Sequence, residues 1–550
     1  MAVFALAVPS CVRAQSGTTS LRGTVTDKTG ATVVGANVSL TNAAQSLQRQ
    51  TQTSGTGSYE FQALPPGSYA LSIEMTGFRR YERKNMQLQV DSPSTADVTL
   101  DIGTTAETVE VSAAAVTLNT ADASLGNAFD ENQIKQLPMD ARNVPDLLSL
   151  QAGVAYTGNR PDINTDTDTR SGAVNGARSD QSNITLDGVD VNADTKGYAF
   201  TSVLPVTADS VQEFRVTTSN YNADEGRSSG AQVSLVTKSG TNAFHGSVYE
   251  YNRNTLTSAN DYFIKQAELQ DGQPNKPLQL IRNNFGASLG GPIIKQRLFF
   301  FVNYEGEREA QQQSVVRIVP SAALRNGIVM YNCDDPTACP GGTVQGVNGQ
   351  SFAVAAGNAA VGPAAIKTMD PQGVGISSGV MIPYFQSLPM PNDNTVGDGL
   401  DFVGYRFAGA APITTNWYIA RADYKITANG NHTLFWRGAM RTDNTAKVPY
   451  LPGQAPTQDQ VDYSKGFAVG YSAVLKSNLV NNFHYGYTRQ SLGQIGNQTQ
   501  QFVEFRGLND NSTPNNSSFQ EFPTTTFQVP VHNFLDDVSW IKGNHTFTFG

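Results

Sequence analysis

The chain has 550 residues, 15% of them charged, and a formal net charge of −9 at pH 7. This length predicts several domains, because single hydrophobic cores stop growing at about 250–300 residues. The charged fraction is below the roughly 25% of typical soluble domains. The acidic balance and the lack of a basic run argue against a nucleic-acid binder. With 50 glycines, 20 tyrosines and 27 phenylalanines at a mean hydropathy of −0.32, the composition favours a β-rich protein whose strands alternate apolar and polar residues.

The first residues predict export. Residues 1–15 begin with an apolar segment, and Val12-Arg13-Ala14 is similar to a small-residue cleavage site. We therefore expect a signal peptide that lacks its basic start; the alternative is a disordered apolar N-terminus. Cys11 would leave with this segment, and Pro9-Ser10 before it fits a lipoprotein anchor poorly. Beyond it no apolar run reaches about 18 residues, so we expect no transmembrane helix.

Residues 18–102 are predicted to form a β-sandwich. Short segments with period-two alternation are separated by turns rich in glycine and proline. The most specific segments are residues 23–27, 35–38, 57–61, 64–69 and 77–78. With these segments the unit resembles the carboxypeptidase regulatory-like domain, a transthyretin-like sandwich similar to carbohydrate-binding modules, and the resemblance implies no peptidase activity. Two roles stay open, binding of carbohydrate or a partner and a periplasmic spacer, because a fold alone does not give a function.

Residues 103–125 have the small, polar composition of a linker. Within them, Glu107-Thr108-Val109-Glu110-Val111 alternates like a lone β-strand. Such a strand suits addition to the sheet edge of a partner, where backbone hydrogen bonds provide the affinity. The segment resembles the TonB box of energy-coupled receptors. The alternative is that it forms the last strand of the sandwich.

Residues 126–243 form a mixed α+β unit, with short helices expected at Asp130–Leu137 and Val144–Leu150. Its motif residues are Leu186, Asp187, Gly188, Gln212, Glu213, Phe214, Thr237, Lys238, Ser239, Gly240, Thr241 and Asn242. In their order and spacing these motifs resemble the plug domain of TonB-dependent receptors in the Oar-like branch, which carries the regulatory-like domain in front. Ala141-Arg142-Asn143 departs from the family, which usually has Gly before Arg-Asn, and this weakens a local turn assignment.

Residues 244–550 are predicted to be the N-terminal part of a transmembrane β-barrel. Tyr418, Tyr424, Phe483 and Tyr485 fall on apolar strand faces that we expect to contact lipid, while Arg421 and Asp423 fall on a face that lines a wet lumen. Short turns such as Asn429-Gly430-Asn431 alternate with long polar stretches, expected to be extracellular loops, at residues 306–415, 442–464 and 489–532. Residues 283–286, 290–292 and 299–305 resemble the start of the Oar-like barrel. About nine strands are recognisable, whereas plugged transporters use ~22, so we expect a truncated barrel.

Sequence motifs for catalysis and cofactors are weak. Cys333 and Cys339 favour one loop disulfide over a metal site. Gly375-Ile376-Ser377-Ser378-Gly379 matches the nucleophile-elbow pattern, but it lies in a loop rather than between a strand and a helix. A weak candidate for a calcium-binding loop consists of Asp393, Asp398 and Asp401, because these residues lack the EF-hand spacing. We expect no enzyme, no cofactor and no metal site.

The resemblance implies an outer-membrane receptor that captures a ligand, such as a carbohydrate or peptide, with its extracellular loops. Movement of the plug would be driven by the inner-membrane TonB complex pulling on the N-terminal segment. The sandwich and plug would then lie on the periplasmic side or in the barrel lumen, and outer-membrane lipid would surround the strands. The alternative is a surface adhesion or scaffold protein that binds glycan or protein without transport.

Overall fold

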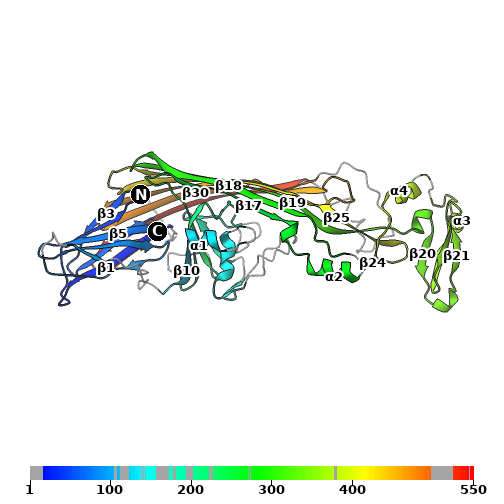
Figure 1. Cartoon of the computed structure of the whole chain (residues 1–550), viewed down its shortest axis with the longest axis horizontal. Helices are drawn as coiled ribbons and strands as arrows, with labels where there is room; N and C mark the ends of the chain where they lie inside the picture. The colour runs from blue at the N-terminus through cyan, green and yellow to red at the C-terminus, as the bar shows by residue number, and fades with distance from the viewer. Residues whose placement is uncertain are drawn as a thin grey trace, which may run out of the picture.

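The computed structural model is elongated, with a β-sandwich at one end, a small mixed unit in the middle and a long curved sheet that runs past both of them (Figure 1). We call these the sandwich, the plug and the wall. The predicted signal peptide lies outside the described residues. The structure describes residues 17–103, 108–111, 123–137, 139, 142, 144–155, 173–177, 181–193, 202–221, 226, 228–270, 272, 274–376, 379, 381–496, 524–543 and 545–550.

The sandwich consists of two sheets. In one, β1 pairs with β4, β7 and β8; the other has the order β3-β2-β5-β6-β9. Alternate residues point between the sheets, so that Leu21, Val25, Leu40, Leu71 and Ile73 are fully buried in one cluster. The strands are β1 (Thr19–Asp27), β2 (Asn37–Asn42), β3 (Leu47–Gln52), β4 (Ser58–Leu64), β5 (Gly67–Glu74), β6 (Arg80–Leu88), β7 (Ser94–Thr95), β8 (Val98–Leu100) and β9 (Thr108–Val111).

The plug is built on a sheet of order β10-β15-β16-β13-β14. Helix α1 (Glu131–Gln136) begins with a capping box, in which the Asp130 side chain accepts from the Gln133 amide and the Gln133 side chain accepts from the Asp130 amide. The second predicted helix is a 3₁₀ helix, η1 (Val144–Leu150). The strands are β10 (Leu125–Asp130), β11 (Val154–Ala155), β12 (Ala173–Val174), β13 (Asn183–Leu186), β14 (Val189–Asp190), β15 (Val211–Ser219) and β16 (Gln232–Thr237).

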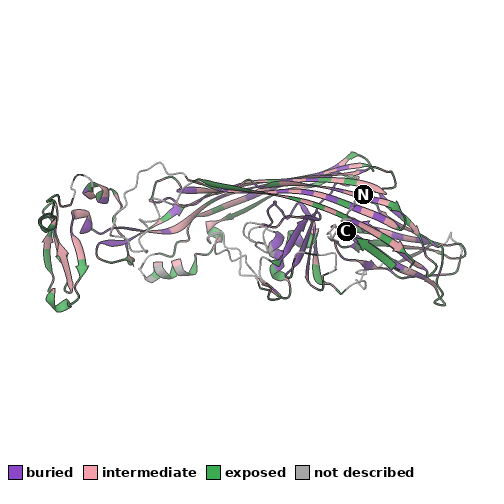
Figure 2. Cartoon of the chain, turned by 180° about the vertical axis from the view of Figure 1, so that it is seen from behind, coloured by how far each residue is buried: buried purple, intermediate pink, exposed green. Residues whose placement is uncertain are grey.

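The wall is a 12-stranded antiparallel sheet that begins at β17, ends at β32 and does not close on itself among the described residues. Buried and less buried residues alternate along its strands (Figure 2), as expected for a sheet with two different faces. Its strands are β17 (His245–Asn254), β18 (Leu280–Ile294), β19 (Leu298–Pro320), β24 (Asp393–Gly397), β25 (Phe402–Ala410), β26 (Ile413–Lys425), β27 (His432–Ala446), β28 (Gln458–Asp462), β29 (Lys465–Lys476), β30 (Leu479–Gly496), β31 (Thr525–Lys542) and β32 (His545–Phe549).

The strands reach further than the sequence indicated, and the three loop predictions are wrong at their boundaries. β19 continues to Pro320, β27 to Ala446 and β30 to Gly496. Polar side chains pair across these extensions, as where Arg282 of β18 forms an ion pair with Glu309 of β19. A polar strand that extends beyond an apolar band therefore resembles a loop in sequence.

The far end of the molecule carries a small unit between β19 and β24 (Figure 1). A disulfide joins Cys333 to Cys339, and the Gly357 amide donates to the Cys339 carbonyl across 2.8 Å. No helix among the described residues is long and apolar enough to span a membrane. The elements of this unit, together with the short helices before β18, are η4 (Thr255–Thr257), α2 (Tyr262–Gln270), η5 (Leu324–Asn326), β20 (Val329–Asn332), η6 (Pro336–Ala338), β21 (Gly342–Gln345), β22 (Ser351–Val354), β23 (Asn358–Val361), α3 (Pro363–Met369) and α4 (Met381–Ser387).

Candidate functional site where plug, wall and sandwich meet

Asp187 and Gly188 form the tight turn between β13 and β14, whose flanking residues Leu186 and Val189 pair directly. Both turn residues have positive φ, 52° for Asp187 and 78° for Gly188. Two-residue hairpin loops of this kind strongly favour Asp-Gly, because glycine and short polar residues adopt such angles most easily. The turn points the Asp187 carboxylate out of the plug towards the wall.

The Asp187 carboxylate bridges the plug and the wall. The Thr237 amide donates to Oδ1 across 2.9 Å, within the plug. From the wall, Arg421 Nη1 lies 2.9 Å from Oδ1 and Arg437 Nε lies 3.1 Å from Oδ2. Arg437 also donates from Nη2 to the Leu186 carbonyl across 3.0 Å. One carboxylate therefore holds two arginines on adjacent wall strands.

Arg421 and Arg437 face each other directly in the register of β26 and β27. Like charges at opposing positions destabilise an antiparallel pair. Arg437 is completely buried, so its charge needs a nearby anion. Asp187 supplies that anion, and Asp423 on β26 is a second partner for Arg421, with Nη2 and Oδ1 2.9 Å apart. The wall thus carries a cationic pair that the plug neutralises.

The motif at 212–216 joins the plug to the sandwich. Phe214 is fully buried in the plug core, while Gln212 Nε2 donates to the Pro66 carbonyl across 3.3 Å. Glu213 Oε1 accepts from the Val90 amide across 2.9 Å. Burial raises the pKa of the Glu213 carboxyl to about 8, and the Val90 hydrogen bond and nearby charges only modify this shift. Of these charges Arg215 lowers the pKa, whereas Asp91 and Asp130 raise it.

The motif at 237–242 leads from the plug into the first wall strand and contacts all three units. Lys238 Nζ lies 3.0 Å from Glu131 Oε1 and donates to the Asp209 carbonyl. Ser239 accepts from Gln45 of the sandwich across 2.7 Å. The Asn242 side chain donates to Ser46 of the sandwich and accepts from the Gln296 amide of a wall turn. The Thr241 hydroxyl donates locally to the Ala243 carbonyl. A Cβ on Gly240 would overlap the backbone oxygen of Phe300, so glycine is required by this close approach.

A second link between plug and wall lies outside the three plug motifs. Arg142 Nη2 lies 2.8 Å from Asp209 Oδ2 and 3.6 Å from Glu305 Oε2 of β19. The guanidinium also covers the rings of Tyr249 and Tyr251 on β17, with its carbon 5.1 and 4.3 Å from their centroids. Arg142 belongs to the segment where the sequence departs from the family; its neighbours Ala141 and Asn143 lie outside the described residues. Asp209 and Glu305 could not be singled out from sequence, because only folding brings them together.

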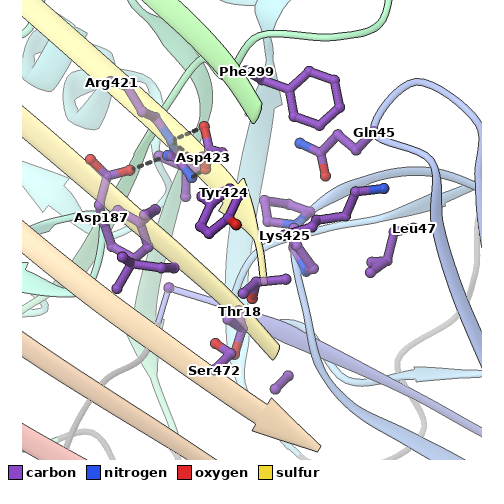
Figure 3. A pocket seen from close by; sticks show the side chains of 18 of the residues that line it. Thr18, Gln45, Leu47, Asp187, Phe299, Arg421, Asp423, Tyr424, Lys425 and Ser472 are labelled. Carbon is purple, nitrogen blue, oxygen red and sulfur yellow. Dashed lines mark hydrogen bonds and ion pairs between the residues drawn. The ribbon is translucent and has the colours of Figure 1, made fainter. Parts of the chain in front are cut away.

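A cavity of about 110 Å³ lies between the three units (Figure 3). We call it the junction pocket. Asp187, Arg421 and Asp423 line one side of it, and Gln45, Leu47 and Lys425 line another (Figure 3). Arg49, Phe299, Leu434 and His484 also line it.

The other candidate residues lie elsewhere. Thr108–Val111 forms β9 at the edge of the sandwich, in parallel register with β6, which matches the second of the two alternatives; Glu107 lies outside the described residues. Ser377 and Ser378 of the elbow-like segment also lie outside them. Asp393 pairs with Arg406 at 2.7 Å, Asp398 accepts from three backbone amides and Asp401 from the Met330 amide. These carboxylates are therefore engaged in holding the loop unit together.

Comparison with known proteins identifies the wall. The family model described as "Outer membrane beta barrel domain" matches residues 236–550, more than half of the chain. The chain belongs to this outer-membrane β-barrel family. A second model, "Carboxypeptidase regulatory-like domain", matches residues 20–101. The resemblance of the sandwich to the regulatory-like domain, the expected outer-membrane barrel and the outer-membrane location are thereby confirmed.

This member of the outer-membrane β-barrel family is 29% identical over 280 residues to the TonB-dependent transporter Oar of Myxococcus xanthus, a match covering 49% of this chain and 25% of that protein. Among solved structures, the outer membrane transporter YddB from Escherichia coli is similar at 11% identity and a TM-score of 0.44, covering 77% of this chain and 47% of that one. The siderophore receptor PirA from Acinetobacter baumannii matches at 12% identity and a TM-score of 0.40, covering 76% and 45%. The chain spans about a quarter of the length of Oar and about half of these two structures.

Proposed function

We propose that this chain belongs to an outer-membrane receptor that takes up a ligand through a gated lumen, with the plug as the gate. The single observation that carries this proposal is the Asp187 carboxylate, which is inserted between Arg421 and Arg437 of the wall. An open pore needs no plug, and an adhesin needs no removable polar contact within its barrel. The similarity to a TonB-dependent transporter supports the same role.

The contacts of the gate are suited to reversible release. Ion pairs hold the plug against the wall at Asp187 and Arg142, and water in the lumen can replace such partners when the plug moves. The proposed ligand is a carbohydrate or a peptide, which the receptor captures at its extracellular end. Energy would come from the TonB complex, which pulls on the N-terminal part of the chain.

A test that needs no knowledge of the ligand uses a cysteine in the plug. Thr185 is buried in β13, so Thr185→Cys should react with a membrane-impermeant maleimide only when the plug moves. We expect labelling in intact cells to be several-fold faster with a working TonB complex than after addition of an uncoupler. Equal labelling in both states would contradict gating and favour the adhesion or scaffold alternative.

A disulfide lock gives the matched control. A Cβ added at Gly486 of β30 would lie 3.0 Å from the Cβ of Val189 in the plug, so the two strands need to separate by about 0.5 Å to reach the spacing of a disulfide. Val189→Cys with Gly486→Cys should therefore abolish the energy-dependent labelling of Thr185→Cys under oxidising conditions. A reductant should restore it.

The role of Thr108–Val111 can be separated from that of the sandwich. Val109→Pro removes a backbone donor in β9, whereas Glu110→Gln leaves the backbone intact. If the segment is the TonB-binding strand, the proline should stop the labelling while the sandwich keeps its thermal stability. A fall in sandwich stability with unchanged labelling would show that β9 only completes the sheet.

A further inference from the structure

The junction pocket contains two buried cations that the fold itself leaves without a carboxylate partner. Arg49 of the sandwich is 5% exposed and Lys425 of the wall is 6% exposed, and both line the pocket. Arg49 Nη1 donates to the Asn431 side-chain oxygen across 3.0 Å, and Lys425 Nζ donates to the Ser46 carbonyl across 2.9 Å. In the described part of the chain neither group forms an ion pair, and Arg49 Nε has no hydrogen-bond partner.

The charges on the other side of the pocket do not balance these two. Asp187 and Asp423 are shared between Arg421 and Arg437, so that two carboxylates already serve two guanidinium groups. Arg49 and Lys425 therefore remain as a positive excess. Burial without an anion lowers the pKa of Arg49 to about 10, in keeping with a charge that lacks its counterpart. Buried charges are ordinarily paired, because an isolated one is costly.

We propose that the junction pocket binds a small organic acid, whose carboxylate lies between Arg49 and Lys425. A guanidinium and an ammonium group facing one cavity provide charge-assisted donors for a carboxylate. Leu47, Phe299 and Leu434 give the same pocket apolar walls, which suit the hydrocarbon part of the ligand. Since Arg49 lies on the sandwich and Lys425 on the wall, the bound acid would join these two units. Binding of the acid at this pocket would not require the chain to transport a ligand.

Benzoate is a suitable probe, with benzyl alcohol as its neutral counterpart and inorganic phosphate as an anion without an apolar part. Titration calorimetry on the detergent-solubilised chain at low ionic strength should show benzoate binding. Benzyl alcohol and phosphate should each bind about tenfold more weakly than benzoate. Benzyl alcohol lacks the negative charge, and phosphate lacks the apolar ring. Equal affinities for benzoate and benzyl alcohol would overturn an anion site, and equal affinities for benzoate and phosphate would overturn the assignment to an organic acid.

Substitutions locate the site. Arg49→Gln and Lys425→Gln should each weaken benzoate binding about tenfold, and Arg49→Lys should recover part of the loss. Arg79→Gln and Lys476→Gln change the charge equally at exposed positions and should have no effect. Unchanged affinity in Arg49→Gln would refute the proposal.

Asn431→Ala distinguishes a binding site from mere docking of the sandwich. This change removes the acceptor that ties Arg49 to the wall but keeps both cations at the pocket. Benzoate affinity should be retained or rise, because the guanidinium is freed for the ligand. An affinity loss as large as that of Arg49→Gln would mean that Arg49 acts only by holding the sandwich in place, and the site would be rejected.

Discussion

Replacing Asp187 by Asn should release the plug from the wall at a lower denaturant concentration. Asn has nearly the same shape and tolerates the positive φ of the turn, so the hairpin should persist. The charge is lost, however, and Arg437 is left buried without its carboxylate opposite Arg421. Breaking a buried ion pair from one side costs about 3–5 kcal/mol. Because an Asn oxygen still accepts one hydrogen bond and Arg421 keeps Asp423, we expect the lower end of that range.

The assay is urea titration of Thr185→Cys labelling in the solubilised barrel. With a urea dependence of about 1–3 kcal/mol per molar, a loss of about 3 kcal/mol lowers the midpoint of plug release by roughly 1–3 M. The heat-modifiable electrophoretic band of the wall should not change. This comparison separates plug release from unfolding of the barrel.

Asp423→Asn is the graded control. It removes one partner of Arg421 but leaves the shared Asp187 carboxylate in place, so a loss of only about 1 kcal/mol is expected. Equal midpoints for Asp187→Asn and Asp423→Asn would refute the idea that Asp187 holds the plug. A higher midpoint for Asp187→Asn would do the same, since it would mean that the buried ion cluster destabilises the closed state.

Three further predictions concern the other contacts. Glu213, with its raised pKa, keeps a proton in the folded chain that the unfolded chain loses above about pH 4.5. The free energy of unfolding should therefore fall as the pH rises from about 4.5 to 8, by up to about 1.4 kcal/mol per pH unit. Urea titrations of Glu213→Gln should show a flatter dependence on pH. Gly240→Ala should weaken docking of the plug by at least about 1 kcal/mol, measured by the urea dependence of Thr185→Cys labelling. Gly543→Ala is the control: it lies in an exposed wall turn where an added Cβ meets nothing, so it should affect only the stability of that turn. Val302 is 43% exposed on the outer face, so Val302→Arg should lower the folding free energy in lipid vesicles by ~2–4 kcal/mol. Asn303→Arg on the inner face should lower the folding free energy in the same vesicles much less.

The sequence was most informative where a local rule applies. Asp187-Gly188 could be recognised as part of a motif, and its two-residue turn follows from the angles that these residues adopt. The two faces of β26 follow from alternation in the middle of the strand: Arg421 binds the plug, whereas Tyr418 is 42% exposed on the opposite face. At the end of the strand Tyr424, which was expected to contact lipid, lines the junction pocket instead (Figure 3). The capped start of α1 at Asp130 is equally local.

Long-range partners could not be predicted in this way. Arg437 bonds to Asp187 from 250 positions away, and no spacing in the sequence connects them. The same holds for Arg142 and Glu305, and for Arg49, which is an ordinary strand residue in the sequence. The ends of the wall strands failed for another reason: polar residues that pair beyond the apolar band have the composition of loops.

The motifs of the plug lie mostly at its borders rather than in its core. Asp187 contacts the wall, Glu213 contacts the sandwich and Asn242 contacts both, while Leu186 and Phe214 are packed inside. The buried apolar cluster of the plug takes only Ile419 and Ala439 from the described wall. Apolar surface that becomes exposed to water finds no favourable partner there, whereas polar groups can be rehydrated, so a gate held mainly by polar groups can open without a large hydrophobic penalty. In the proposed gate, a plug that is stable as a unit can therefore leave its place by exchanging polar contacts for water rather than by exposing a large apolar surface.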